Sequence, residues 1–359
     1  MYKKIKTQKI ILTVGIPTYN RQKKLEKCLE SVIHQQADGN VEILISDNAS
    51  QDATQEYVRE VMALHELNIR YIRNKANEGF DNNIISIYKN AKGRYIWFLS
   101  DDDEILPGAL GRVLDALIKH KPAVLYPNEL GITGESMTKN DQFVDIVSYL
   151  PTGLGIRVKT DEELLVNKDV ARLAVVRLAS FISCCIVEKQ NGIASEILKL
   201  NYSGTGLVQD AIMSLVLLQR PTVYLLKTPS VRMGLRASFS KWSMESTLFG
   251  FRKLYSNKAL KYPNDLANKV SLNNCKFGLL ILAQKKILKI PVDFVLDKKQ
   301  LIRLIKFYKT DSFSLALFIL VALISKIMPG FLIKASFQLV YRFAKIVSIR
   351  RENFSESII

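Results

Sequence analysis

The sequence predicts an α/β protein whose largely parallel sheet lies between helices. The first observation is an alternation of two kinds of segment. Through about residue 120, short apolar runs rich in β-branched residues alternate with segments whose apolar residues recur at helical spacing. Alternating strands and helices of this kind form parallel sheets that helices cover. The second observation is that polar loops follow three of the runs, at the edge where such sheets bind ligands.

The expected strands are apolar runs bounded by polar or turn-forming residues. In chain order they cover residues 9–16, 41–46, 68–74, 94–99 and, later, 180–189. The first run, KIILTVGI, is expected to end at Pro17.

The expected helices fill the intervals between these strands. One face of the segment 21–35 carries apolar residues at helical spacing, namely Leu25, Cys28, Leu29, Val32 and Ile33. Further helices are expected from about residue 53, across 82–90, and after Pro107, which suits the first turn of a helix.

Three polar loops are expected to meet at the carboxyl edge of the sheet: PTYNR, SDNASQD and SDDDE. The last loop holds Asp101, Asp102 and Asp103. Clustered carboxylates at a strand's end form a hard oxygen site for Mg²⁺ or Mn²⁺, and Mg²⁺ is usually completed by substrate phosphates. The alternative is a solvated acidic turn at the N-terminus of the next helix, where negative charge is favourable.

Two other kinds of α/β site are excluded by the first loop. A dinucleotide-binding fold needs a Gly-rich turn there, whereas GIPTYN has its glycine before the proline. A P-loop needs a Gly-rich loop ending in Lys-Ser or Lys-Thr, which the sequence lacks. The histidines, His34, His65 and His120, lie on expected helices, so a Ser-His-Asp site has little support.

A family resemblance is carried by blocks in this order: VGIPTYNRQKKLEKCLESV, ISDNASQDAT, NEGFDNNI and AKGRYIWFLSDDDEILP. Together they resemble family 2 glycosyltransferases, which have the GT-A nucleotide-sugar fold. The resemblance is strong across residues 9–130 and continues weakly to about residue 240. The segments NEGFDNN and FLSDDDE are most similar to the abequosyltransferase-like branch, whose members act in surface-polysaccharide assembly.

The resemblance implies a role for each residue that matches a family motif. The first-loop residues expected to pack around the base and phosphates of a nucleotide-sugar donor are Pro17, Thr18, Tyr19 and Arg21. Asp47 matches the aspartate that reads the base, and Asp101 matches the ribose contact. Asp102 and Asp103 match the ligands of a Mn²⁺ or Mg²⁺ ion on the diphosphate. Because Ser100 replaces the first aspartate of the usual Asp-X-Asp-Asp pattern, the sequence leaves open which two aspartates bind the metal.

Inverting transfer also requires a base that takes the proton of the acceptor hydroxyl as its oxygen attacks the anomeric carbon. The family places an acidic residue at the start of a late helix. Asp210, in GTGLVQDAIMSLVLL, matches it, with Gln209 in place of the preceding acid. The alternative is that Asp210 interacts with the helix dipole alone. Arg232 or Arg236 is placed to close over the diphosphate, and Arg236 is our candidate; a surface role is the alternative.

Charge divides the chain into an expected catalytic domain, 1–245, and a helical C-terminal region, 246–359. Residues 241–359 hold 21 Lys and Arg against 7 Asp and Glu, which is +14 of the net +17. The apolar run 312–325 is shorter than the roughly 20 residues of a spanning helix. The segment FLIKASFQLVYRFAKIVSIRR has the pattern of a basic helix in a membrane interface. We therefore expect peripheral binding to an anionic membrane surface, with helices that pack on the catalytic domain as the alternative.

The expected function is an inverting, metal-dependent hexosyl- or deoxyhexosyltransferase. It would move a sugar from a nucleotide-sugar donor to a lipid-linked saccharide or growing cell-surface polysaccharide. The alternative is a non-catalytic nucleotide- or glycan-binding protein on the same fold. Nucleic acid is excluded as a partner because the basic residues of the tail alternate with aliphatic runs, not with aromatic stacking platforms. The cysteine spacing and the N-terminal residues favour a cytoplasmic protein without a signal peptide, on the inner face of the cell membrane.

Overall fold

The structure is a computed structural model of the 359-residue chain. It describes residues 9–35, 39–127, 129–130, 163–165, 182–200, 204–226, 228–232, 234, 250–262, 264 and 302. The chain divides into two units, the first comprising Met1–Leu235 and Phe249–Ser271 and the second Arg236–Leu248 and Leu272–Ile359. Apart from residue 302, the described residues belong to the first unit, whose fold follows.

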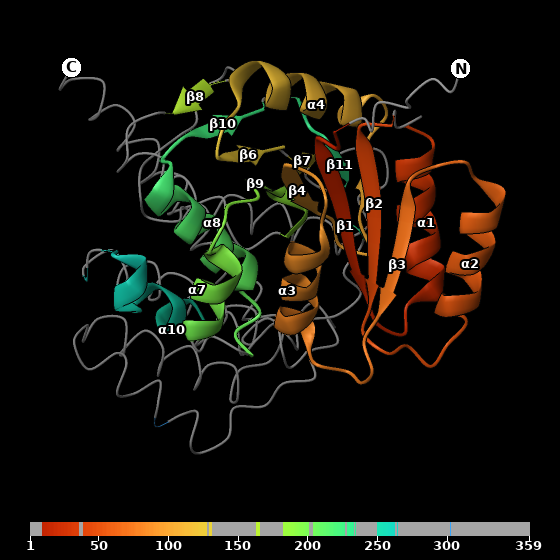
Figure 1. The fold of residues 1–359 in the computed structure, drawn as a ribbon, viewed down its shortest axis with the longest axis horizontal. Coiled ribbons are helices and arrows are strands. Elements are labelled where there is room, and N and C mark those ends of the chain that lie inside the picture. The colour runs from red at the N-terminus through yellow and green to blue at the C-terminus, as the bar shows by residue number, and fades with distance from the viewer. Residues whose placement is uncertain are drawn as a thin grey trace, which may run out of the picture. The chain divides into compact units, whose positions relative to one another are not determined.

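A mixed, mostly parallel sheet forms the centre of this unit, in the order β3-β2-β1-β4-β9-β6-β10-β8 (Figure 1). Its strands are β1 (Leu12–Thr18), β2 (Val41–Asp47), β3 (Ile69–Arg73), β4 (Tyr95–Phe98), β6 (Val124–Tyr126), β8 (Glu163–Leu165), β9 (Cys185–Glu188) and β10 (Val223–Leu225). The first four strands are mutually parallel, as predicted, and β9 runs antiparallel between β4 and β6. A small second sheet joins β5 (Glu104–Ile105), β11 (Val231–Arg232) and β7 (Glu129–Leu130).

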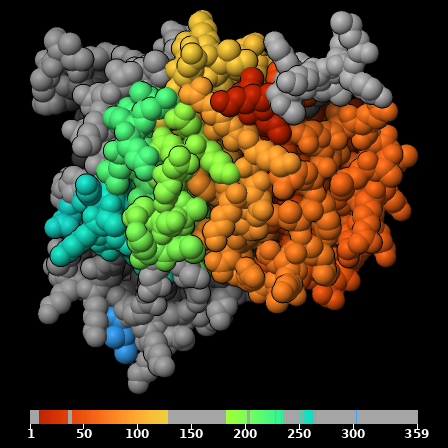
Figure 2. Space-filling view, in the orientation of Figure 1, coloured from red at the N-terminus to blue at the C-terminus, as the bar shows by residue number. Residues whose placement is uncertain are grey.

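Helices cover both faces of the large sheet, because successive strand residues point to opposite sides. On β2, Ile43 and Ile45 join one buried cluster and Leu44 joins the other. The helices of the first cluster are α1 (Gln22–Ile33), α2 (Thr54–Leu64) and α4 (Ala109–His120). Those of the second are α3 (Phe80–Asn90), α7 (Ile193–Lys199), α8 (Val208–Gln219) and α10 (Phe251–Tyr255). In Figure 2 the green residues of α7 and α8 lie against the orange residues of α3.

The predicted elements of the N-terminal part are confirmed, with shifts at their ends. On α1, Leu25, Cys28, Leu29 and Val32 are buried and Ile33 is partly buried. The prediction that Pro17 ends the first strand is wrong, because β1 continues to Thr18. The pairing of β1 with β4 has already ended at Gly15, so the missing N–H of Pro17 breaks no ladder on that side. Helix α4 begins at Ala109, after Gly108 in the left-handed region (φ 70°), so Pro107 precedes the helix.

The segment after residue 249 contributes to the core of the first unit. From α10, Phe251, Leu254 and Tyr255 are buried in the cluster with α3, α7 and α8. Leu260, in the short 3-10 helix Lys258–Leu260, joins them. The division at residue 245 therefore stays a prediction, and residues 265–301 and 303–359 lie outside the described part of the chain. In the described residues, no helix has the length and apolar character needed to cross a membrane.

Candidate active site

The carboxyl ends of β1, β2 and β4 lie at one edge of the sheet, because the three strands are parallel neighbours. The loops that follow them are bonded to each other. The Asn20 N–H donates to Ser50 Oγ at 2.9 Å, and the Gln51 N–H donates to Asn20 Oδ1 at 2.6 Å. The Thr18 hydroxyl donates to Asp101 Oδ2 at 2.9 Å, which joins the first loop to the acidic turn. The predicted meeting of the polar loops is confirmed.

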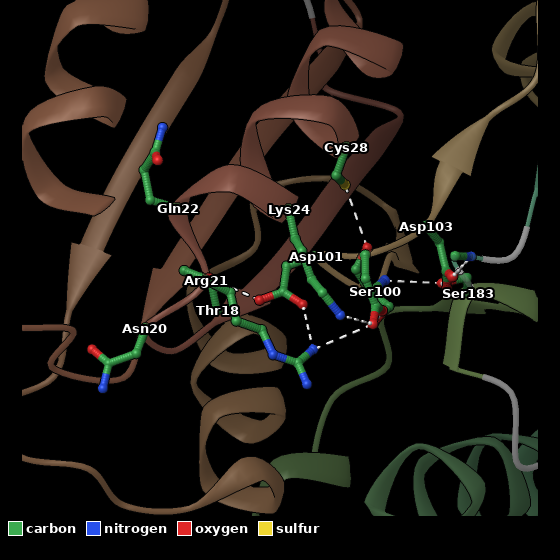
Figure 3. Close-up of polar contacts among 12 residues, drawn as sticks. Thr18, Asn20, Arg21, Gln22, Lys24, Cys28, Ser100, Asp101, Asp103 and Ser183 are labelled. Carbon is green, nitrogen blue, oxygen red and sulfur yellow. Dashed lines mark hydrogen bonds and ion pairs between the residues drawn. The ribbon is translucent and has the colours of Figure 1, made fainter. Parts of the chain in front are cut away.

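Asp101 is a buried carboxylate held between two partners. Its Oδ2 accepts the Thr18 hydroxyl, and its Oδ1 lies 3.0 Å from Arg21 Nη1 (Figure 3). Burial raises the pKa of Asp101 to about 6, and the negative charge of Asp102 adds to the rise, although Arg21 acts against it. Arg21, at the start of α1, thus neutralises a carboxylate that would otherwise be costly to keep out of water.

Asp102 is the carboxylate of the turn with a solvent-facing side, since 19% of its side chain is exposed. Its Oδ2 lies 3.2 Å from Lys24 Nζ and 3.4 Å from Arg21 Nη1, and its Oδ1 accepts the Ser100 hydroxyl at 2.6 Å. Burial opposes ionisation, yet the Ser100 hydrogen bond and the two cations hold the pKa of Asp102 below its ordinary value. Asp102 therefore stays ionised and faces two half-exposed cations.

Asp103 turns away from Asp102 and into the protein. Its Oδ2 accepts the Ser183 hydroxyl at 2.6 Å, and its Oδ1 accepts the Gly234 N–H at 2.8 Å. Ser183 Oγ in turn accepts the Ser100 N–H at 2.9 Å, and the Ser183 carbonyl accepts Trp97 Nε1–H at 2.8 Å. Asp103 thereby fastens the acidic turn to the segment before β9 and to residue 234.

The three aspartates do not form a ready-made metal cage. Across the described residues, no group of three or more His, Cys, Asp and Glu side chains is arranged to hold a metal ion. Asp102 fits a different arrangement, in which Mg²⁺ or Mn²⁺ takes one or two carboxylates and completes its shell with substrate phosphates and water. The contacts of Asp103 with Ser183 and Gly234 make it the weaker candidate ligand, and its metal role stays a prediction.

Asp47 lies at the end of β2, as predicted, and is fully buried. Its Oδ1 accepts the Ser50 N–H at 2.8 Å, and its Oδ2 accepts the Tyr71 hydroxyl at 2.5 Å, with Arg73 Nε at 3.4 Å. Burial and the bond to Asp47 raise the pKa of Tyr71 well above its ordinary value. Tyr71 and Arg73 were not singled out from the sequence. The signal for them was the parallel strand β3, whose end must lie beside that of β2.

The remaining first-loop residues differ in exposure. Pro17 is buried within β1, whereas 40% of Tyr19 is exposed. Asn20 follows with φ 53°, in the left-handed region that Asn tolerates. The turn leaves the Tyr19 ring open to solvent beside the loop that carries Asp47 and Ser50.

Asp210 lies in the first turn of α8 and is fully buried. Burial raises the pKa of the Cys185 thiol, and the charge of Asp210 adds to the rise, which indicates that Asp210 lies near β9. The turn before α8 is fixed by Asp81 of α3, whose Oδ2 accepts the Gly206 N–H at 3.1 Å. Asp210 therefore lies on the helix that packs against β9. Arg236 lies outside the described residues.

Comparison with known proteins supports the fold and the family. Residues 13–166 match the family model of glycosyl transferase family 2. This segment belongs to that family. Over 102 residues the chain is 36% identical to the abequosyltransferase RfbV of Salmonella typhimurium, which covers 28% of this chain and 31% of that protein. Over 103 residues it is 33% identical to the GalNAc(5)-diNAcBac-PP-undecaprenol beta-1,3-glucosyltransferase of Campylobacter jejuni, covering 29% and 33%. The matched segment thus spans about a third of each curated relative.

The fold of the described residues is the GT-A fold that the resemblance implied. The crystal structure of TarS 1-349 from S. aureus superposes with a TM-score of 0.55 at 15% identity, over 83% of this chain and 80% of that one. The same protein in complex with UDP gives 0.54 at 13% identity, over 83% and 79%. At these identities, the structural similarity shows the fold alone.

Proposed function

We propose that this chain is an inverting, metal-dependent glycosyltransferase that moves a hexosyl or deoxyhexosyl group from a nucleotide sugar to a lipid-linked saccharide or growing cell-surface polysaccharide. One observation carries the proposal. Thr18, Arg21 and the pair Asp101–Asp102 converge where β1 and β4 end. That edge of a parallel sheet is where nucleotides bind. Its cations suit a diphosphate, and its ionised carboxylate suits the divalent ion that the diphosphate would carry.

The donor would lie across the loops after β1 and β2. Tyr19 offers an exposed ring for the base, and the Asp47 group fixes the loop that the base would contact. Asp101, steadied by Thr18, would be the ribose contact. Arg21 would bind the diphosphate. Asp102 would hold Mg²⁺ or Mn²⁺, which when bound neutralises the charge of the departing diphosphate.

In the reaction, an acceptor hydroxyl oxygen forms a bond to the anomeric carbon while the bond from that carbon to the diphosphate breaks. The nucleoside diphosphate leaves with the electron pair, and Asp210 takes the hydroxyl proton. Because Asp210 is fully buried, this role requires the turn at Gly204 and Gly206 to move before the acceptor reaches it. Both glycines have positive φ, 79° and 69°.

The acceptor is proposed from the relatives. One is named for a substrate that contains PP-undecaprenol, and the other is named an abequosyltransferase. A lipid-linked acceptor lies at a membrane, and the net +14 of residues 241–359 would draw the protein to an anionic surface on the cytoplasmic side. Vesicle sedimentation tests this part. The full chain should pellet with anionic vesicles and be only partly released by high salt, and its failure to pellet would overturn the membrane proposal.

The main test is a screen of nucleotide sugars for release of nucleoside diphosphate, with Mn²⁺ and with excess chelator. We expect release from one donor class, its loss in chelator, and its loss in Asp102→Asn. Asp115→Asn, an exposed aspartate on α4, is the matched control and should keep full activity. Binding of a nucleotide sugar without release or transfer would instead indicate the non-catalytic binding protein.

The base has its own test. Asp210→Asn should bind donor normally but turn over at least about 100-fold more slowly, the usual effect of losing a general base. The product should have the opposite anomeric configuration to the donor. Near-normal turnover in Asp210→Asn, or a retained configuration, would contradict the assignment.

A further inference from the structure

Two cations converge on one oxygen of Asp102. Lys24 Nζ lies 3.2 Å and Arg21 Nη1 lies 3.4 Å from Asp102 Oδ2. Arg21 and Lys24 stand three residues apart at the start of α1, so both side chains reach the acidic turn from the same side (Figure 3). Nothing in the sequence resemblance singled out Lys24.

The two cations are held differently. Arg21 also binds Asp101 Oδ1 at 3.0 Å, and Asp101 is buried, so Arg21 is anchored. The ion pair that the structure gives to Lys24, within its described part, is the one with Asp102. The Lys24 side chain is 46% exposed, and exposed lysine–carboxylate pairs are weak because water competes for both charges. Lys24 can therefore leave Asp102 for a stronger anion at small cost.

A diphosphate is such an anion, because it carries several negative charges. Its oxygens accept charge-assisted hydrogen bonds from an ammonium group. The same Asp102 oxygen would also be the ligand of a divalent ion. Lys24 and the metal thus compete for Asp102. Asp102 and the donor's diphosphate compete for Lys24.

We propose that Lys24 is a diphosphate-binding residue whose ammonium group stays paired with Asp102 until the donor and the metal bind. This inference rests on the proposed function and assigns a new residue to its site. On binding, the metal takes the Asp102 oxygen and Lys24 passes to the diphosphate. The exchange makes an unusual prediction. Removing the Lys24 charge should strengthen metal binding to the free protein and weaken diphosphate binding.

The experiment uses the full chain and the variants Lys24→Met and Lys24→Arg, with Lys23→Met as the matched control. Lys23 is exposed on the same turn, so its variant makes the same change in net charge. Electron paramagnetic resonance measures the binding of Mn²⁺ alone, and calorimetry measures the binding of inorganic pyrophosphate in excess chelator. Thermal unfolding confirms that each variant is folded.

Lys24→Met should bind Mn²⁺ about threefold more tightly, since a weak competing pair is lost. It should bind pyrophosphate about tenfold more weakly, the size expected for one charge-assisted hydrogen bond. Lys24→Arg should restore pyrophosphate binding, and Lys23→Met should match the wild type in both assays. Unchanged affinities in Lys24→Met, or changes of the same sign, would overturn the inference while leaving the proposed function intact. Failure of the wild-type protein to bind pyrophosphate in chelator would also overturn the inference, whereas the proposed function, which requires a divalent ion, is tested separately by diphosphate release with Mn²⁺.

Discussion

Asp102 and Asp103 are neighbours in sequence, yet the structure predicts opposite consequences for their removal. In Asp103→Ala, the Gly234 N–H and the Ser183 hydroxyl lose the carboxylate that accepts their hydrogen bonds at 2.8 and 2.6 Å. The buried Ser183 hydroxyl left without an acceptor costs about 1–3 kcal/mol, and the partly buried Gly234 N–H costs less because water can reach it. Removing the carboxylate also removes the cost of keeping a charge nearly dry, so we expect a loss of about 2–3 kcal/mol in the free energy of unfolding.

Asp102→Ala should leave the free energy of unfolding within about 1 kcal/mol of wild type, because its two cations are half exposed and such pairs contribute little. Asp102→Ala should instead weaken the metal-dependent binding of nucleotide. The two variants thus separate a structural aspartate from a ligand-binding one.

Urea unfolding followed by the fluorescence of Trp97 measures both effects. Trp97 is fully buried and donates Nε1–H to the Ser183 carbonyl, so it reports on the segment that Asp103 fastens. A Trp242→Phe background leaves Trp97 as the sole tryptophan of the chain. Ser183→Ala should reproduce part of the Asp103→Ala loss. A free energy of unfolding of Asp103→Ala within about 0.5 kcal/mol of wild type, or an equal loss in Asp102→Ala, would show that Asp103 does not have this structural role.

Further predictions concern three positions around the site and the sheet. Burial raises the folded-state pKa of Asp81, so its contribution to stability is present at low pH and is lost as pH rises through that pKa. Asp81→Asn, which keeps an acceptor for Gly206, should therefore be more stable relative to wild type at pH 8 than at pH 4 in urea melts, and no change with pH would contradict this. Gly234→Ala would set its Cβ 1.9 Å from the Asp102 carbonyl oxygen. It should therefore lower the free energy of unfolding by about 1–3 kcal/mol and also lower kcat/KM. Glu42→Ala, at the far end of β2, should lose its bonds with Thr13 and Arg70 and cost about 1.5–3 kcal/mol without changing nucleotide affinity, as calorimetry would show.

The N-terminal strands and the meeting of the polar loops could be predicted because their causes are local. Helical spacing on α1 depends on residues three and four apart, and adjacent parallel strands bring their carboxyl ends to one edge. The insertion of β9 between β4 and β6 depends on pairing between segments far apart in the sequence, which local periodicity does not encode.

The roles of individual aspartates were harder to predict for the same reason. Asp103 bonds Ser183 and Gly234, which stand 80 and 131 residues away in the sequence. The enclosure of Asp47 by Tyr71 likewise depends on the register of β3 against β2, in which Asp47 lies opposite Arg73. Three consecutive carboxylates look equivalent in the sequence and have three different environments in the fold.

A crystal structure of the full chain, soaked in turn with UDP, GDP and CDP together with Mn²⁺, would locate the donor site. We expect a nucleoside diphosphate at the carboxyl ends of β1 and β4, with Mn²⁺ on Asp102 and the diphosphate within hydrogen-bond distance of Arg21 and Lys24. A nucleotide bound elsewhere, or a diphosphate that contacts none of these residues, would contradict the proposed donor site.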